Sequence, residues 1–520
     1  MLDKWLKRPV HLYLYLFALI IVAVGVSISK VLMSIGTIWL IANWLLEGNF
    51  KSKLDRFKNQ YVLWAIFGFF IFSIISLAWS DDINYGMHDL RIKLPLLIIP
   101  FVVGTSKPLE KSHFYLVIYL FLSGLIIASL WNYISYYFNL NTVKNIREMS
   151  SFISHIRFSI SINLGIFLSI YLLLKKQVNW VVLSLIIVWL VYYQYKSQVI
   201  NGYILFVVLT GVSVLFLIKN IANKKLKTSI YFLLGIGFVS LIVIGWLGWT
   251  NQSNQKIKID YSKLELYTAN GNGYYHIKNN KISENGALVY IYISAKECKR
   301  AWNKRSNLKF EGLDKTSQKL EGTLYRYMTS KNLRKDSIGF LSLDDQDIVN
   351  IENGYSNFNI NKGIVEKISD LKMQWFMLQT NGNPNGNSLI QRKIHLETAL
   401  DILKKHWLFG VGIGDVKLAF DEQYTLNDSV LNKENRYKSH NQYLTVWISH
   451  GIIGLFFILF LFIYPIKLNI KKCDYSVCII IIALSFSFLW QDMIETQAGV
   501  TIFSLFYALA VFNSKQYGKN

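Results

Sequence analysis

Residues 114–138 of the chain have the sequence FYLVIYLFLSGLIIASLWNYISYYF, a stretch without a single charged residue. A helix needs roughly 20 apolar residues to cross the hydrocarbon core of a bilayer, so this stretch predicts a transmembrane helix. Similar runs recur along the 520-residue chain, of which 52% is hydrophobic and only 17% is charged. This composition, with six prolines and three cysteines, excludes a soluble multidomain protein, a disulfide scaffold, a fibrous repeat and a disordered protein.

The hydrophobic runs predict an α-helical polytopic membrane protein with about twelve spanning segments. These segments are residues 12–29, 31–46, 61–79, 94–104, 114–138, 158–174, 180–195, 199–218, 230–249, 443–466, 477–490 and 499–512. The first two segments also fit a tight hairpin. The fourth is short and carries Pro95 and Pro100, so a tilted or re-entrant piece is the alternative to a full crossing.

Loops rich in lysine and arginine alternate with acidic or sparsely charged loops, such as the acidic loop between the last two segments that holds Asp492 and Glu495. The basic loops include Lys4, Lys7 and Arg8, then Lys51, Lys53, Arg56 and Lys58, then Lys175 and Lys176, and later Lys467, Lys471 and Lys472. By the positive-inside rule both termini are predicted to be cytoplasmic. Residues 1–249 then hold helices 1–9, residues 250–439 form an extracytoplasmic (periplasmic) domain, and residues 440–520 hold helices 10–12. The net charge of +23 reflects this topology and predicts no nucleic-acid partner.

The extracytoplasmic segment has the features of a folded, mixed α/β domain. Alternating apolar residues at 287–293 predict a strand, and Trp302, Phe310, Trp375 and Phe376 are expected to supply a core. Apolar residues at helical spacing in 394–407 predict an amphipathic helix near the outer membrane surface. That helix is expected to end at the glycine-rich turn Gly410-Val-Gly412-Ile-Gly414, after which Asp415 is expected to cap a further helix.

The sequence Ser439-His440-Asn441 leads into the tenth predicted helix and is the main candidate for chemistry. If Ser439 caps the helix, His440 lies in the first turn, where the helix dipole keeps the imidazole neutral and able to accept a proton. Gly451 and Gly454 would let a neighbouring helix approach closely. The alternative is a histidine that only forms a hydrogen bond at a helix start.

Several motifs together resemble the O-antigen ligase and polymerase superfamily. His440-Asn441 followed by Gly451 and Gly454 is similar to the signature of that family. The helix start at residues 154–159 and the arrangement of Arg392, an amphipathic helix and the glycine-rich turn are also similar. Residues 322–330 (GTLYRYMTS) and 333–336 (LRKD) resemble the outer segment of a ligase-like bacterial subgroup.

The resemblance implies a GT-C-like fold and an inverting glycosyltransferase that works at the outer face of the bacterial inner membrane. It implies a glycan donor linked to undecaprenyl pyrophosphate, with His440 as the catalytic base. Arg157 and Arg392 are candidates to bind the pyrophosphate, because arginine stays charged and forms paired hydrogen bonds with phosphate oxygens. The alternatives are interfacial snorkelling for Arg157 and a solvated charge for Arg392. Asn441, Gly412 and Gly414 are further candidates for substrate binding, although a glycine-rich turn that only ends a helix explains the glycines equally well.

The sequence departs from the family pattern at residues 196–202 (KSQVING), where relatives often carry an arginine. Lys196 is a candidate substitute for its charge, without the paired hydrogen bonds of a guanidinium group. Arg91 and Lys93 are weaker candidates for contact with pyrophosphate or a lipid headgroup. No His, Asp or Glu cluster compels a metal, so a metal-independent reaction without a cofactor is expected.

The leading hypothesis is a ligase that transfers a glycan from undecaprenyl pyrophosphate to a hydroxyl of a lipid A-core or similar acceptor. A polymerase that joins repeat units on the same carrier is the closest alternative. A transporter or flippase of lipid-linked sugar, and a non-catalytic assembly subunit, are further alternatives. Membrane lipids are expected partners in each case.

Overall fold

The computed structural model describes residues 8–138, 146–219, 260–277, 282–284, 287–315, 318–358, 374–375, 384–385, 388–469 and 474–512. The chain forms two compact units. We call residues Met1–Ile221 with Arg392–Asn520 the transmembrane unit, and residues Ala222–Gln391 the inserted unit. Residues 392–439, which the sequence analysis grouped with the extracytoplasmic segment, pack with the transmembrane unit.

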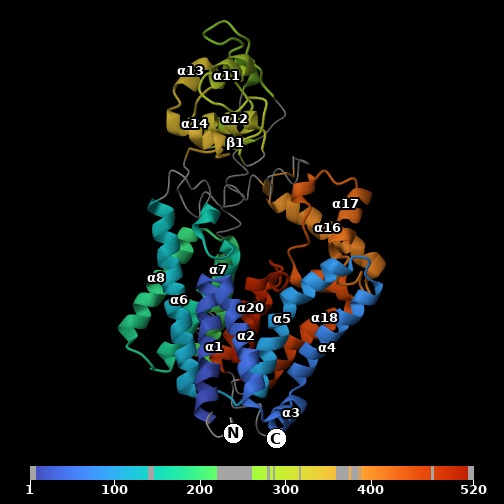
Figure 1. Ribbon diagram of the computed structural model, residues 1–520. Coiled ribbons are helices and arrows are strands. Elements are labelled where there is room, and N and C mark those ends of the chain that lie inside the picture. The colour runs from blue at the N-terminus through green and yellow to red at the C-terminus, as the bar shows by residue number, and fades with distance from the viewer. Residues whose placement is uncertain are drawn as a thin grey trace. The chain divides into compact units, whose positions relative to one another are not determined.

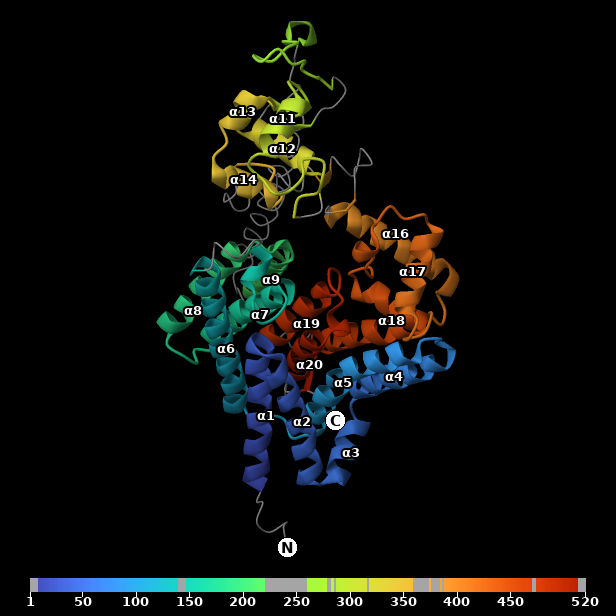
Figure 2. The ribbon, with the colours of Figure 1, turned by 45° about the horizontal axis from the view of Figure 1, so that its top comes forward.

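Helices form nearly all of the transmembrane unit (Figures 1 and 2). Its first part contains α1 (Arg8–Ile28), α2 (Lys30–Glu47), α3 (Phe50–Lys58), α4 (Tyr61–Ile75), η2 (Ser76–Trp79), α5 (Ile83–Thr105), α6 (Lys111–Phe138), η3 (Ile146–Met149), α7 (His155–Leu174), α8 (Trp180–Ser197) and α9 (Ile200–Lys219). Its second part contains α16 (Ser388–His406), α17 (Val416–Leu426), η5 (Lys433–Asn435), α18 (Gln442–Asn469), α19 (Tyr475–Ser487), η6 (Met493–Glu495) and α20 (Gln497–Phe512).

Among the described residues, eight helical stretches are long and apolar enough to cross a membrane. They are Val10–Ile28, Lys30–Glu47, Tyr61–Trp79, Lys111–Phe138, His155–Leu174, Trp180–Ser197, Ile200–Ile218 and Gln442–Lys467, and each overlaps a segment predicted from the sequence. The predicted segments at 477–490 and 499–512 correspond to the shorter apolar helices α19 and α20. The predicted segment at 230–249 lies outside the described residues.

Helix α5 is longer than the fourth predicted segment. It runs without a break from Ile83 to Thr105 and contains both Pro95 and Pro100. Its first half carries Asp89, Arg91 and Lys93, and this raised charge content hides the start of the helix from an analysis of hydrophobic runs. Helix α5 packs against α2, α4 and α20, and its Lys93 forms an ion pair with Glu495 in η6.

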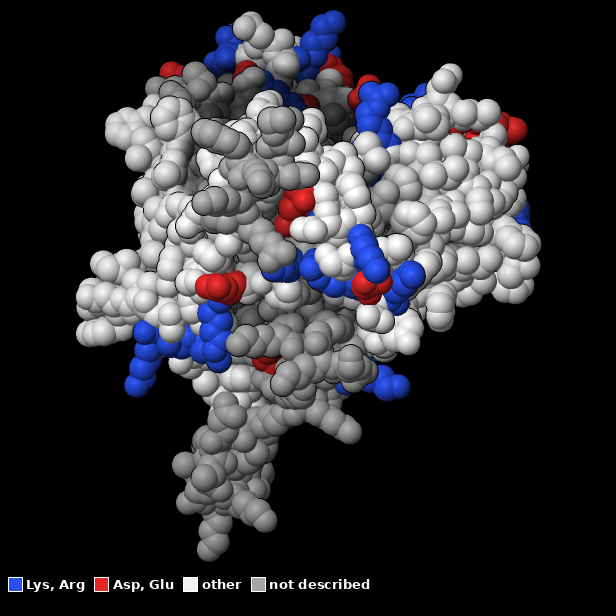
Figure 3. Space-filling model, turned by 60° about the horizontal axis from the view of Figure 1, so that its bottom comes forward, with Lys and Arg blue, Asp and Glu red and all other residues white. Residues whose placement is uncertain are grey.

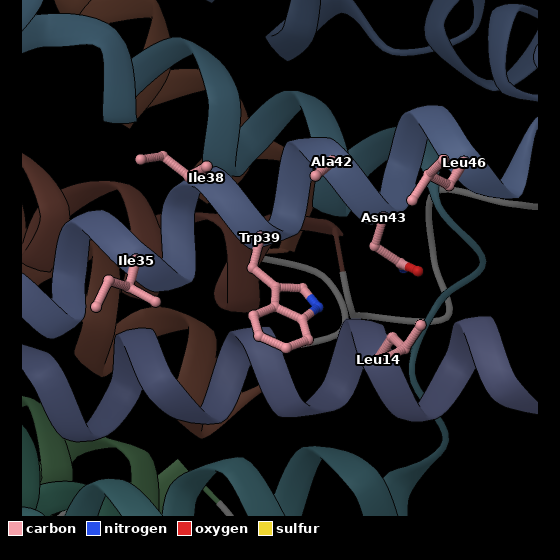
Figure 4. Close-up of a pocket in the computed structure, with 7 residues that line it drawn as sticks. All are labelled: Leu14, Ile35, Ile38, Trp39, Ala42, Asn43 and Leu46. Atoms are coloured by element: carbon pink, nitrogen blue, oxygen red, sulfur yellow. The ribbon is translucent and has the colours of Figure 1, made fainter.

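Helices α1 and α2 form the tight hairpin that was one of the alternatives for the first two segments. A side chain at Gly36 would come within 2.6 Å of Val22, so the glycine allows the close approach of the two helices. His11 Nδ1 and Asn43 Oδ1 lie 2.9 Å apart across the hairpin. Figure 4 shows the apolar groove on this hairpin, lined by Leu14, Ile35, Ile38, Trp39, Ala42, Asn43 and Leu46.

Helices α4 and α18 pack antiparallel along most of their length. Tyr61 contacts Tyr464 at one end, and Ser73 Oγ lies 2.8 Å from Nε2 of the buried His450 near the other. Helix α18 is interrupted at Gly451, whose φ of 64° and ψ of −164° are not helical. Its first part, from Gln442 to His450, packs with α16 and α17 around Ala399, Phe420 and Ile448.

The described part of the inserted unit consists of short helices, one short two-stranded sheet and the loops that connect them. It contains η4 (Tyr261–Lys263), β1 (Ser283–Glu284), β2 (Ala287–Leu288), α11 (Ala295–Trp302), α12 (Leu320–Ser330), α13 (Ser337–Leu341) and α14 (Asp345–Glu352). The strand predicted at 287–293 is reduced to the antiparallel pair of β1 and β2, with Ser283 opposite Leu288. Trp302 and Phe310 lie in its core as predicted, Trp375 is 42% exposed, and Phe376 lies outside the described residues.

Helix α3 lies at one end of the transmembrane unit (Figure 1) and is rich in basic residues. Helix α3 carries Lys51, Lys53, Arg56 and Lys58, and Lys53 forms an ion pair of 2.8 Å with Glu47. Figure 3, which turns this end toward the viewer, shows several groups of lysine and arginine, some of them beside acidic residues, on a largely uncharged surface. By the positive-inside rule, this is the end that the topology prediction places on the cytoplasmic side.

Candidate functional site

The start of α18 places His440 just before the helix. Contrary to the prediction from the sequence, Ser439 does not cap the helix and His440 does not lie in its first turn, because α18 begins at Gln442 and Oδ1 of Asn441 accepts the backbone N–H of Leu444 at 3.2 Å. Ser439 instead forms a local turn, in which its Oγ accepts the backbone N–H of Asn441 at 3.2 Å. His440 therefore has a left-handed backbone, with φ of 52°, which is uncommon for a residue with a side chain.

Two aromatic rings and a carboxylate surround the imidazole of His440. The ring of His395 on α16 lies edge-on at 5.5 Å between centroids, and the ring of Tyr437 lies at 5.9 Å. Oδ2 of Asp492 is 3.7 Å from Nδ1 of His440. About a third of the His440 side chain remains exposed, so a substrate group can reach it.

Burial and two nearby arginines lower the pKa of His440 to about 4. Burial is the larger cause, and the positive charges of Arg392 and Arg157 contribute. The imidazole is therefore neutral at pH 7, as a general base requires. A neutral imidazole was predicted from the helix dipole. Its cause is instead the burial of the side chain and the nearby arginines.

Arg157 approaches this site from the first turn of α7. Its Nε is buried and has no hydrogen-bond partner among the described residues. A side chain at Gly499, near the start of α20, would come within 3.1 Å of that Nε, so the glycine leaves room for the guanidinium group. A buried donor without a partner is costly, and an anionic ligand would satisfy it.

Arg392 and His395 reach the site from the start of α16. His395 is buried, and its Nε2 donates to the backbone oxygen of Asn435 at 3.0 Å. Burial lowers the pKa of His395 to about 4, and the positive charge of Arg392 contributes. The structure thus brings together three residues from distant parts of the sequence, His440, Arg157 and Arg392.

Asp492 lies in the loop between α19 and α20 and faces His440. Oγ1 of Thr445 donates to Oδ1 of Asp492 at 2.6 Å, which holds the carboxylate in place. Burial raises the pKa of Asp492, so this side chain gives up its negative charge more easily than an exposed aspartate. Its position beside Nδ1 leaves Nε2 of His440 as the nitrogen available to a substrate.

The glycine-rich turn joins α16 to α18 and to the end of α4. The backbone N–H groups of Val411 and Gly412 donate to the oxygens of Ile448 and Ser449, at 2.8 and 3.0 Å. The N–H groups of Ile413 and Gly414 donate to Oγ of Ser76 and Ser80. A side chain at Gly412 would come within 2.2 Å of Ser80 Oγ, and one at Gly414 within 2.4 Å of the Asp82 oxygen. These N–H groups are already occupied, which favours the packing explanation of the glycines over direct phosphate binding.

Asp415 and Lys196 have contacts that the sequence did not predict. The carboxylate of Asp415 accepts the backbone N–H groups of Asp81 and Asp82, at 2.9 to 3.0 Å, and does not cap α17 with its side chain. Nζ of Lys196 lies 5.8 Å from the ring centroid of Tyr137 and 5.7 Å from that of Tyr192. Lys196 is therefore held by a cation–π contact with α6 and α8.

Residues 351–459 match the family model described as O-antigen ligase. This match supports the O-antigen ligase and polymerase superfamily. The O-antigen ligase match includes Arg392, the glycine-rich turn, His440, Asn441 and Gly451, whereas Arg157 and Asp492 lie outside it. No protein with a curated functional description matches the chain. Together with the apolar helices, the O-antigen ligase match indicates a multi-pass bacterial membrane protein with an O-antigen ligase-like or polymerase-like role.

Sequence reasoning missed several residues around His440. It assigned Asp492 and Glu495 only to an acidic outer loop, and it gave no role to His395, Lys438 or Thr445. Most of these residues either lie far from His440 in the chain or have an ordinary local context, so no local pattern indicates that they are close to it. A signal was present in Glu495, because an acidic residue between two apolar segments is costly near a membrane unless it has a partner. No group of three or more His, Cys, Asp or Glu side chains in the described part of the chain is placed to hold a metal.

Proposed function

We propose that this protein is an inverting, metal-independent glycosyltransferase that acts as a ligase at the outer face of the bacterial inner membrane. The donor is a glycan linked to undecaprenyl pyrophosphate, and the acceptor is a hydroxyl of lipid A-core or a similar glycan. The inserted unit lies on the periplasmic side. The observation that carries the proposal is the placement of a neutral, partly exposed His440 close to the charges of Arg157 and Arg392.

The reaction breaks the bond between the anomeric carbon of the glycan and the pyrophosphate oxygen, and forms a bond from that carbon to the acceptor oxygen. His440 takes the proton of the acceptor hydroxyl on Nε2 as the new bond forms. The carboxylate of Asp492, 3.7 Å from Nδ1, stabilises the imidazolium that results. The proton then leaves to solvent, which restores the neutral base.

The leaving group is undecaprenyl pyrophosphate, which gains negative charge as the bond breaks. Arg157 and Arg392 neutralise this charge, and the unpartnered Nε of Arg157 donates to a phosphate oxygen. Asn441 uses Oδ1 to cap α18, so its amide nitrogen is the group that would contact substrate. The glycine-rich turn supports the site by fixing α16 on α18. Lys196 is held by its cation–π contacts with Tyr137 and Tyr192, so we assign it at most a minor electrostatic role in binding the pyrophosphate.

An assay with purified protein in detergent tests this proposal. The protein is incubated with an undecaprenyl-pyrophosphate glycan and a lipid A-core acceptor, with and without chelator, and products are followed by gel shift and mass spectrometry. We expect chelator-insensitive attachment of the glycan to the lipid A-core. Lengthening of the carrier-linked glycan in the absence of acceptor would instead identify a polymerase. Loss of transfer with chelator would contradict the metal-independent reaction.

Replacing Arg392 by glutamine is expected to shift the pH profile of the reaction. In the wild type, kcat/KM should fall on the acid side as the pH drops through about 4, where His440 becomes protonated. Removing a neighbouring positive charge raises the pKa of His440, so the acid limb of the Arg392→Gln variant should move to higher pH. We expect kcat/KM at pH 7 to fall by about 10- to 100-fold, because one donor to the pyrophosphate is lost. Lys393→Gln, at an exposed neighbouring position, serves as the control and should keep the wild-type profile.

A further inference from the structure

One carboxylate binds the residues on both sides of His440. Oε2 of Glu495 forms an ion pair of 2.8 Å with Nζ of Lys438, two residues before the histidine. Oε1 of Glu495 accepts a hydrogen bond of 3.2 Å from Nε2 of Gln442, two residues after it. The loop that carries His440 is thus bound at both ends to the same side chain in η6.

Helix α5 supplies a third attachment to this carboxylate. Nζ of Lys93 lies 3.0 Å from Oε1 of Glu495 and also forms an ion pair with Asp89, one turn earlier in α5. The side chain of Lys93 is almost completely buried. Glu495 therefore connects α5, the His440 loop and the start of α18.

The amide of Gln442 strengthens the same connection. Its Oε1 accepts the backbone N–H of Ile494 at 2.8 Å, next to Glu495, and its backbone N–H donates to the oxygen of Phe488 at 2.8 Å. Gln442 is fully buried, so water does not compete for these bonds. The first residue of α18 is fixed to both ends of the loop between α19 and α20.

The opposite charges around Glu495 hold it in its ionised form. Burial raises the pKa of Glu495, but the positive charges of Lys438 and Lys93 outweigh this effect and hold the pKa well below its usual range. Burial lowers the pKa of Lys438, and Glu495 more than reverses that effect. Glu495 is thus an anion between two cations, and buried pairs of this kind fix a geometry when every partner is present.

His440 needs such support because of its backbone. A left-handed φ of 52° is less favourable than the helical conformation for a residue with a side chain, and surrounding contacts must maintain it. The local turn of Ser439 and Asn441 holds the loop from within. The bonds of Lys438 and Gln442 to Glu495 hold it from outside.

We propose that Glu495 is a positioning residue that clamps the loop of His440 and sets the direction of its imidazole toward the acceptor hydroxyl. We call Glu495, Lys438, Gln442 and Lys93 the Glu495 clamp. The role of Glu495 rests on the function proposed above, in which His440 is the general base. Glu495 itself does not touch the substrate and acts through the loop.

The test uses the full-length protein in detergent and the variant Glu495→Gln, which keeps the shape of the side chain and removes its charge. The first readout is independent of turnover: the rate at which diethyl pyrocarbonate modifies His440, measured by mass spectrometry. Release of the loop should raise this rate severalfold. The second readout is glycan transfer, for which we expect kcat to fall about 10- to 100-fold while KM for the donor stays within about twofold, because a misplaced base costs rate and not binding.

Two further variants separate positioning from stability. Glu495→Gln combined with Lys438→Met removes both members of one ion pair, so it should recover part of the melting temperature lost in Glu495→Gln while kcat stays low. Glu422→Gln on α17, at an exposed carboxylate, should match the wild type in both readouts. Recovery of kcat together with the melting temperature in the double variant would show a purely structural role and overturn the proposal.

The outcomes distinguish the clamp from the function on which it rests. An unchanged modification rate at His440 in Glu495→Gln overturns the clamp, whatever the activity. A raised modification rate with unchanged kcat overturns the positioning role. If His440→Ala transfers glycan as well as the wild type, the proposed function fails, and the modification rate still decides whether Glu495 holds the loop.

Discussion

Replacing His440 by alanine is expected to lower kcat for glycan transfer by about 10³-fold, because a positioned general base contributes about 10²- to 10⁴-fold to such reactions. Without the imidazole, the acceptor hydroxyl must attack while it still carries its proton. The donor site is intact in this variant, so binding of undecaprenyl pyrophosphate should change little. The measurement compares transfer rates and donor binding of the purified variant with those of the wild type.

His406→Ala is the matched control for this experiment. His406 is exposed at the end of α16 and lies, like His440, within the O-antigen ligase match, but it is not placed at the site. We expect His406→Ala to transfer glycan at the wild-type rate. Equal activity of wild type and His440→Ala, with both proteins folded and inserted, would exclude His440 as the base and favour transport or assembly.

Replacing Gly451 by alanine should have the largest effect on stability. Gly451 has a φ of 64°, and a β-carbon there would lie 2.0 Å from the backbone oxygen of Leu408. The strained backbone costs about 1–3 kcal/mol, and the clash with a backbone atom, which cannot move aside, should bring the total to about 3–5 kcal/mol. We expect a clear drop in melting temperature, a low yield of monodisperse protein and loss of transfer.

Gly48→Ala separates the two causes. Gly48 has nearly the same φ, 66°, but no atom lies within 4 Å of the position that a β-carbon would occupy. This variant should show only the cost of the strained backbone, a much smaller fall in melting temperature. Equal losses in the two variants would mean that the close approach of Leu408 to α18 contributes nothing to stability.

The Gly451 prediction depends on the junction between α16 and α18. The backbone oxygens of Trp407 and Leu408 accept the N–H of Ile452, at 3.0 and 3.2 Å, where the interruption of α18 leaves that N–H without its helical partner. The glycine pair was expected to bring a neighbouring helix close. The partner is instead the turn that directly follows α16, the helix that also holds Arg392 and His395.

The sequence alone determined the membrane character of the protein and most of its spanning helices. Long apolar runs are local features, and the bilayer requires helices of that length, so eight predicted segments coincide with suitable helices. The family resemblance was also present in local motifs, and the match at residues 351–459 supports it. The length of α5 escaped prediction because buried ion pairs allow charged residues inside a packed helix, and such partners are invisible in a local pattern.

Only the tertiary structure decided how the candidate site is assembled. The motif around His440 was visible in the sequence, but its neutral state comes from burial and from Arg157 and Arg392, which lie far from it in the chain. Glu495 and Asp492 are more than 50 residues after His440, and packing of the loop between α19 and α20 brings them to it. Local sequence governs helix formation and membrane insertion, whereas electrostatic interactions depend on distances in space, which only the packing of the helices sets.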